Sequence, residues 1–183
     1  MSARIDSLAL IHQACWQALD LAARQPEHPF RLMGLASVDG DAADLRTVVL
    51  REVAADQQRL IFFTDARSPK VAQLRAHPGG TLLGWGAALG WQLRLRVTLS
   101  VQTDGLAVSS RWARMKLSPA AQDYLSPLPP GAALGRHPPE RASRAHFAVV
   151  NAQVTAIDWL ELHADGHRRA QFDAAGKGQW VTP

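Results

Sequence analysis

The sequence predicts an α+β fold built on an antiparallel β-barrel, with a helix at the N-terminus and a helical insertion. Short strand-like runs separated by Gly- and Pro-containing turns fill most of the chain, an apolar stripe of helical period precedes them, and a second helical stretch interrupts them after residue 105. With 183 residues, of which 47% are hydrophobic and 20% charged, the chain is long enough to bury a sizeable core. We therefore expect a single domain over residues 1–183.

The N-terminal helix is expected from Ile5 to Arg24, because apolar residues recur there at spacings of three and four and Pro26 follows. Cys15 lies on its apolar side, and a small core residue is favoured over a reactive thiol. As the only cysteine it excludes an internal disulfide, which fits a reducing cytoplasm. No signal peptide and no apolar run of about 18 residues is found, so a cytoplasmic chain with no membrane contact is expected.

The remaining elements follow from alternation, turn residues and helix boundaries. Two strand-like runs flank the turn-rich stretch DGDAAD, and the run QQRLIFFTD is a third strand. Helices are expected over SPKVAQLRAHP, with Ser68 as the cap, and over Leu106 to Leu117 and Pro119 to Leu125. The runs GTLLGWG and GWQLRLRVTLSVQTD are further strands, 126–143 is a Pro-rich loop, and the DG turn of HADGH closes a hairpin near the C-terminus.

The run RTVVLR carries the first chemical signal. Alternation along a strand gives it two faces, each with one arginine beside uncharged residues: Arg46, Val48 and Leu50 on one face, and Thr47, Val49 and Arg51 on the other. A strand with two mixed faces suits a ligand that has a flat apolar body and an anionic end.

The next strand supplies a matching polar end. It finishes at Phe63 and Thr64, and a helix then starts at Ser68 and Lys70. A helix start and a lysine favour a phosphate, to which Arg46 can add a planar fork. The alternative is a surface helix with a capping serine and a solvated lysine, and spacing alone does not separate the two.

In sequence order, RTVVLREV, LIFFTDARSPKVAQL, GWQLRLRV and DWLELHADGHRRAQF resemble the pyridoxamine 5′-phosphate oxidase family of FMN-binding split barrels, from about Arg31 to Pro183. The details look more like a related branch than the vitamin B6 enzyme itself. The resemblance implies a six-stranded split barrel that forms a homodimer, with FMN as the cofactor at the subunit interface and a small-molecule substrate.

By position, the resemblance implies the following FMN contacts: Arg46, Thr47, Val48, Val49, Leu50, Arg51, Phe63, Thr64, Ser68, Lys70 and Gln92, with Trp159 and Arg169 from the partner subunit. It implies a substrate site at Arg51, Trp112, Lys116 and His167. His167 and Arg169 are the candidates for catalysis.

The residues that the resemblance implies for the substrate depart from the pattern of the B6 oxidases. Arg51 replaces a lysine, Asp165 replaces an arginine, Trp112 replaces a tyrosine, and Lys116 lies near an expected arginine. Among the positions that the resemblance implies for FMN, Pro69 replaces an arginine.

Other interpretations are less favoured. His167 flanks a turn, where an exposed histidine is common. The seven histidines show no metal-ligand spacing, so no metal is expected. The run RWARMK fits a solvated helix face, and a net charge of only +4 does not favour nucleic acid as a partner.

The leading hypothesis is an FMN-dependent oxidoreductase acting on an unknown small substrate. One alternative is a flavin-binding carrier or sensor without turnover. Another is a split barrel that binds haem or another large cofactor.

Overall fold

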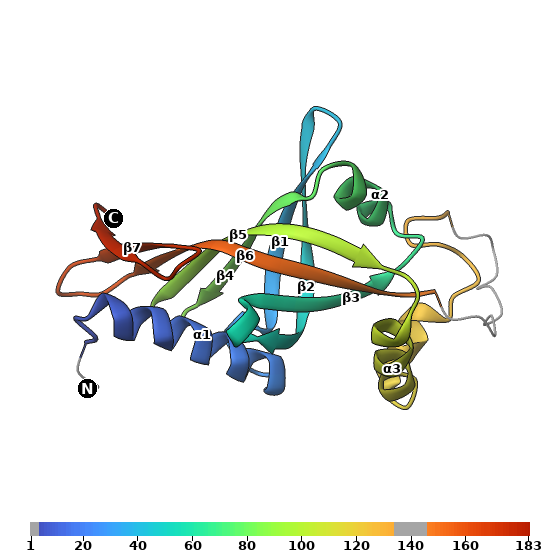
Figure 1. Cartoon of the computed structure of the whole chain (residues 1–183), viewed down its shortest axis with the longest axis horizontal. Coiled ribbons are helices and arrows are strands. Elements are labelled where there is room, and N and C mark those ends of the chain that lie inside the picture. Colours follow the sequence, from blue (N-terminus) through green and yellow to red (C-terminus); the bar gives the residue numbers. More distant parts are fainter. Residues whose placement is uncertain (1–3, 134–145) are drawn as a thin grey trace.

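The computed structural model describes residues 4–133 and 146–183. Its main feature is one antiparallel sheet with the strand order β3-β2-β1-β4-β5-β6-β7-β8, in which β3 also pairs with β6 (Figure 1). That additional pairing closes β3, β2, β1, β4, β5 and β6 into a ring, while β7 and β8 extend from β6. The predicted α+β class and six-stranded barrel are confirmed.

The elements follow the expected order. The strands are β1 (Leu32–Asp39), β2 (Ala42–Ala54), β3 (Arg59–Asp65), β4 (Gly79–Gly86), β5 (Trp91–Gln102), β6 (Phe147–Glu161), β7 (Arg168–Asp173) and β8 (Gly178–Val181). The α-helices are α1 (Leu8–Arg24), α2 (Pro69–Ala76) and α3 (Leu106–Met115), and short 3₁₀ helices cover Pro29–Arg31, Ala55–Gln57 and Pro119–Tyr124. The segment expected as a helix from Pro119 is therefore 3₁₀. The predicted Pro-rich loop can be followed only to residue 133, beyond which it lies outside the described residues.

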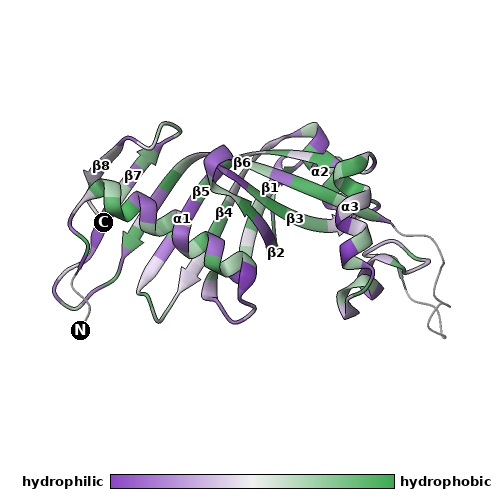
Figure 2. Cartoon of the chain, turned by 60° about the horizontal axis from the view of Figure 1, so that its bottom comes forward, coloured by the Kyte–Doolittle hydropathy of each residue, from purple (hydrophilic) through white to green (hydrophobic). Residues whose placement is uncertain are grey.

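Helix α1 lies along the sheet and supplies part of the core (Figure 1). Polar and apolar bands alternate along it (Figure 2), as expected for a helix with one buried side. Ile11, Cys15 and Leu19 are fully buried. Burial raises the pKa of the Cys15 thiol to about 12, so this side chain behaves as a core residue.

The barrel is split between β2 and β3. Their pairing runs from Ala54 opposite Arg59 to Leu50 opposite Phe62, with a register shift between Leu50 and Glu52. Farther along, β2 pairs only with β1, and β3 pairs only with β6. Each strand therefore has a free backbone edge beside the split, and α2 starts four residues after β3 ends.

Candidate functional site

A cavity of about 110 Å³ lies in the split between β2 and β3. Its lining is mainly apolar, and Thr64 and Lys70 give it one polar end: the lining residues are Leu35, Thr47, Val48, Val49, Phe62, Phe63, Thr64, Lys70 and Val150. Six of the residues predicted to contact FMN thus meet in one place, from β2, from β3 and from the start of α2. A ligand with a flat apolar body and an anionic end suits this cavity.

Lys70 provides the charge at the polar end. Its Nζ atom lies 3.2 Å from Thr64 Oγ1 and 3.1 Å from Ser68 Oγ, and no ion pair links it to a carboxylate among the described residues. Burial of the ammonium, followed by the charge of Arg46, lowers the pKa of Lys70, and this effect is partly offset by Asp65. A half-buried cation beside a second cation is stabilised by an anion, so this end of the cavity fits a phosphate.

The start of α2 offers a phosphate fewer binding groups than the sequence suggested. Ser68 holds the N-cap position but makes no capping hydrogen bond, because its hydroxyl faces Lys70. Pro69 has no N–H group, and the Val71 N–H donates to Ser68 O at 2.9 Å. The alternative of a capping serine with a solvated lysine is nevertheless wrong, because Ser68 does not cap and Lys70 is half-buried.

Arg46 lies close enough to Lys70 to affect its pKa, but its guanidinium is already engaged. It donates to Ser37 Oγ and to Gln73 Oε1, each at 2.6 Å, and it forms an ion pair with Asp44. Gln73 Nε2 also donates to Asp44 Oδ2 at 2.9 Å. Arg46 therefore links β2 to α2 through hydrogen bonds, and its positive charge acts on Lys70. Direct contact between Arg46 and a phosphate remains a prediction.

Gln73 was missed by the sequence reasoning. The available signal was its place in α2, one turn after Lys70. A polar side chain that is buried on a helix of this kind requires a hydrogen-bonding partner, and Gln73 has Arg46, Asp44 and Ser37.

The two other predicted residues of β2, Leu50 and Arg51, lie at the bulge and contact different parts of the molecule. The Leu50 side chain is fully buried in the core, so only its backbone is available to a ligand. Arg51 interacts with Tyr124, whose pKa is raised by burial and partly lowered again by the Arg51 charge and hydrogen bond. Arg51 Nε has no hydrogen-bond partner among the described residues. Bulges often turn a side chain away from the regular sheet direction, which accounts for this placement.

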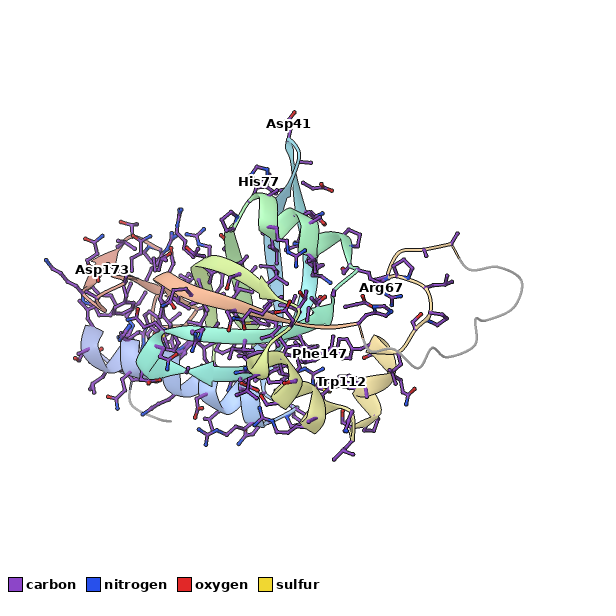
Figure 3. The ribbon with its side chains drawn as sticks, turned by 45° about the vertical axis from the view of Figure 1, so that its right-hand side comes forward. Asp41, Arg67, His77, Trp112, Phe147 and Asp173 are labelled. Carbon is purple, nitrogen blue, oxygen red and sulfur yellow. The ribbon has the colours of Figure 1, made fainter. Side chains whose placement is uncertain are left out.

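An aromatic cluster connects Arg51 to the cavity. The Trp112 ring packs against Phe147 at 5.5 Å and Tyr124 at 6.4 Å between ring centroids. Phe147 in turn packs against Phe63, a cavity residue, at 4.8 Å. Figure 3 shows Trp112 and Phe147 next to each other. The structure therefore brings Arg51 and Trp112 into one cluster, which borders the cavity at Phe63.

Lys116, the third predicted substrate residue, does not join them. It is exposed just beyond α3, and no described contact links it to the cavity.

The remaining predicted residues lie on another part of the sheet. Gln92 and Arg169 both pair with Leu160, so they share one face of β5, β6 and β7. Arg169 forms an ion pair with Asp158 at 2.7 Å, and Arg94 binds the same carboxylate at 2.6 Å. Burial alone would raise the pKa of Asp158, but hydrogen bonds from these arginines and Gln171 outweigh it and lower the pKa to about 2. Within one chain, neither Gln92 nor Arg169 lines the cavity.

Trp159 is placed differently from the prediction, whereas His167 is exposed beside the turn, as its favoured interpretation expected. The Trp159 ring is fully buried in its own chain against Trp91 and Trp180, so the expectation that it closes the flavin site of a partner is not supported. His167 is exposed, and its Nδ1 atom accepts a hydrogen bond from the His163 N–H at 3.2 Å. Its evident role is to stabilise the turn between β6 and β7.

Among the described residues, no group of three or more His, Cys, Asp or Glu side chains is placed to hold a metal ion. In the same part of the chain, no helix has the length and apolar character needed to cross a membrane.

Comparisons with known proteins agree with this geometry. Residues 13–103 match the family model described as "Pyridoxamine 5'-phosphate oxidase, FMN-binding domain". A curated pyridoxine/pyridoxamine 5'-phosphate oxidase of Caulobacter vibrioides is 29% identical over 173 residues, covering 87% of this chain and 76% of that protein. One from Thermosynechococcus vestitus is 36% identical over 80 residues, covering 44% of this chain and 36% of that protein.

Two solved structures share the fold. A pyridoxamine 5'-phosphate oxidase-related, FMN-binding protein of Nostoc punctiforme has a TM-score of 0.74 and 24% identity, covering 93% of this chain and 96% of that chain. PhzG from Burkholderia lata, solved with tetrahydrophenazine-1-carboxylic acid, has a TM-score of 0.73 and 16% identity, covering 100% of this chain and 99% of that chain.

The six-stranded ring with its split and the cavity at that split define an FMN-binding split barrel. This chain belongs to the pyridoxamine 5′-phosphate oxidase-like family of such proteins, and FMN is the cofactor of its domain. The polar end of the cavity suits the phosphate of this cofactor, because a half-buried lysine without a carboxylate partner among the described residues stands where the apolar lining ends. At about 110 Å³ the cavity of one chain encloses only part of FMN.

Proposed function

We propose that this protein is an FMN-dependent oxidoreductase whose cofactor occupies the split between β2 and β3. The observation that carries the proposal is Lys70, a half-buried ammonium that is hydrogen-bonded, within the described ranges, only to the hydroxyls of Thr64 and Ser68. Lys70 binds the phosphate, and Arg46 strengthens the local positive potential from behind. The apolar lining beyond Thr64 contacts part of the body of the cofactor and excludes water from that part.

When bound, FMN supplies the redox chemistry, accepting a hydride equivalent from the substrate. The chain supplies binding, orientation and electrostatics. Free backbone edges of β2 and β3 face the split, so they offer N–H and C=O groups to the polar edge of a bound ring without any change in the sheet.

The substrate class follows from Arg51 and its surroundings. Arg51 has one nitrogen unpaired among the described residues and lies beside Tyr124, which packs in the cluster with Trp112 and Phe147. An arginine beside aromatic rings favours a small planar molecule with one anionic group. The fused-ring carboxylic acid bound to PhzG has this character and supports the choice.

A phosphorylated B6 vitamer is less favoured as substrate. Asp165 stands where the resemblance implies an arginine, and it is an exposed residue of the β6–β7 turn. Lys116 is exposed as well, and the other cations near Arg51 and Trp112 are already engaged, Arg31 by the Ala23 carbonyl and Arg111 by Glu52. We therefore expect low activity on pyridoxamine or pyridoxine 5′-phosphate.

We propose a homodimer as the working assembly. Gln92 and Arg169 share a sheet face outside the cavity of their own chain, so only a second copy can bring them to a flavin. The buried single thiol of Cys15 accords with a cytoplasmic setting, which belongs to the same proposal.

The test combines a spectrum with turnover. The purified protein, reconstituted with FMN, should show flavin absorbance bands. An excess of a partly hydrogenated aromatic carboxylate, which loses two electrons and two protons as it becomes more unsaturated, should reduce the flavin anaerobically. A Soret band, or no affinity for FMN, would refute the flavin site.

A flavin-binding protein without turnover is the second candidate. It is favoured by one observation: the four residues predicted for the substrate do not converge, since only Arg51 and Trp112 share a cluster. Tight FMN binding without reduction by any substrate of the proposed class would support it.

A further inference from the structure

The hairpin formed by β1 and β2 projects from the barrel (Figure 1). Strand β1 pairs with β4 only at Gly34, Leu35 and Ala36, so from Ser37 onward the two arms of the hairpin pair only with each other. A two-stranded ribbon of this kind has little stability of its own and gains from being covered. Figure 3 shows Asp41 at its tip.

The tip is acidic and one face of the hairpin is apolar. Asp39 and Asp41 are exposed and form no ion pair among the described residues. Below them, Val38 and Leu45 are exposed by 39% and 68%. The register places both on the same face as Leu83, because a side chain added at Gly34 would touch Leu45 and Leu83 together.

That same face carries a basic groove at the other end of the sheet. A cavity of about 460 Å³ there is lined by Arg94, Arg96, Ala156, Ile157, Asp158, Gln171, Phe172, Asp173, Lys177, Gly178 and Gln179. The sheet register links it to the apolar patch, since Arg94 pairs with Leu83 and Arg96 pairs with Thr81.

The groove has an excess of uncompensated positive charge. Asp158 is neutralised by Arg94 and Arg169, and Asp173 Oδ1 accepts the N–H groups of Ala175 and Lys177 at 2.9 Å. Within the described ranges, Arg96 and Lys177 have no carboxylate partner and are exposed. Asp173 keeps its negative charge, because backbone N–H groups do not neutralise a carboxylate. The four cations Arg94, Arg96, Lys177 and Arg169 against the two anions Asp158 and Asp173 still leave a net charge of +2, opposite in sign to the two anions of the hairpin tip.

The match cannot be made within one chain. Asp41 and Asp173 lie at distant ends of the molecule (Figure 3), so a second copy has to supply one half. When a tip and a groove lie on the same face, a two-fold axis forms the contact twice, with each hairpin in the groove of the other copy.

We propose that the acidic tip of the β1–β2 hairpin docks into the groove lined by Arg96 and Lys177 of a second copy of this chain. This inference rests on the homodimer proposed above and specifies what holds it in register. Apolar residues Leu45 and Leu83 cover each other between the two charged contacts, which accounts for their exposure in one chain.

Docking also has a consequence for the site. Strand β2 carries the tip at one end and Thr47 and Val49 of the cavity farther along. The groove is continuous with Arg169, because Arg94 and Arg169 share Asp158. Each docked hairpin therefore brings the split of one copy toward Arg169 of the other.

Charge reversal tests the contact. One variant carries Asp39→Lys and Asp41→Lys, and the other carries Arg96→Glu and Lys177→Glu. Sedimentation equilibrium should show each dimer at least about tenfold weaker than the wild type, because both of its contacts become repulsive. Mixing the two variants should restore dimerisation to near the wild-type level, because both contacts of the heterodimer pair opposite charges. Native mass spectrometry identifies that heterodimer by its mass.

A matched control carries Asp56→Lys and Asp104→Lys, two exposed acids outside the hairpin, and should dimerise like the wild type. If both charge-reversed variants dimerise normally, or if mixing them restores nothing, the docking is refuted while the homodimer stands. If the wild type binds FMN as a monomer at all concentrations, both the docking and the homodimer fall.

Discussion

Replacement of Lys70 by methionine separates ligand affinity from stability. Methionine keeps the length of the side chain but removes the ammonium that Thr64 Oγ1 and Ser68 Oγ now bind at 3.2 Å and 3.1 Å. Without ligand, the wild-type ammonium is half-buried, lacks a carboxylate partner among the described residues, and has a pKa lowered chiefly by burial. Its removal should leave the melting temperature of the FMN-free protein unchanged or raised.

The effect on FMN should have the opposite sign. A hydrogen bond between charged groups contributes about 1.5–3 kcal/mol, so Lys70→Met should weaken FMN by about 10- to 150-fold. Riboflavin, which has no phosphate, should lose little affinity. Because the protonated ammonium is the form that binds, FMN affinity of the wild type should also fall as the pH rises through the lowered pKa of Lys70.

Quenching of flavin fluorescence measures both affinities, and differential scanning fluorimetry measures the stability. The matched control is Arg75→Met, which removes a positive charge from an exposed site on the same helix and should change neither quantity. Equal losses for FMN and riboflavin, or marked destabilisation of the FMN-free Lys70→Met protein, would refute the phosphate assignment.

Three further predictions concern stability and reactivity. The Asp158 carboxylate, with its pKa lowered to about 2, adds stability above its unfolded pKa of about 3.9 that is lost as the pH falls toward 2. Asp158→Asn should therefore cost about 1 kcal/mol at pH 7 after solvent screening, and urea unfolding should show the difference vanish near pH 2. Arg67→Ala should lower the urea midpoint at pH 7, because it leaves the buried Asp65 carboxylate without the ion pair at 2.7 Å, with the backbone N–H of residue 67 still donating at 2.8 Å, and an unchanged midpoint would contradict this. Cys15, with its pKa raised to about 12, should react with a disulfide reagent at pH 8 only on unfolding, and rapid reaction of the native protein would contradict its burial.

Much of the fold was predictable because its signals are local. Alternation marked the strands, helical spacing marked α1, and the DG dipeptides marked the turns after Asp39 and Asp165. The closure of the ring by β3 and β6 came only from the resemblance, because it joins segments about 90 residues apart along the chain.

The site was predictable in part. Thr47, Val48, Val49, Thr64 and Lys70 do line one cavity, since regular strands and a helix start hold them there. The direction of Arg51 was not predictable, because strict alternation ends at the β2 bulge.

Contacts that depend on distant packing could not be predicted from the sequence. The burial of Trp159 depends on Trp91 and Trp180, and the engagement of Arg46 depends on Gln73. No local pattern records such partners.

A crystal structure of the protein with FMN is the most direct test of a cofactor site in the split between β2 and β3. We predict a phosphate oxygen within about 3 Å of Lys70 Nζ, with the body of the cofactor beside Thr47 and Val49. FMN bound in the groove lined by Arg94 and Arg96, or bound with its phosphate directed away from Lys70, would contradict the site.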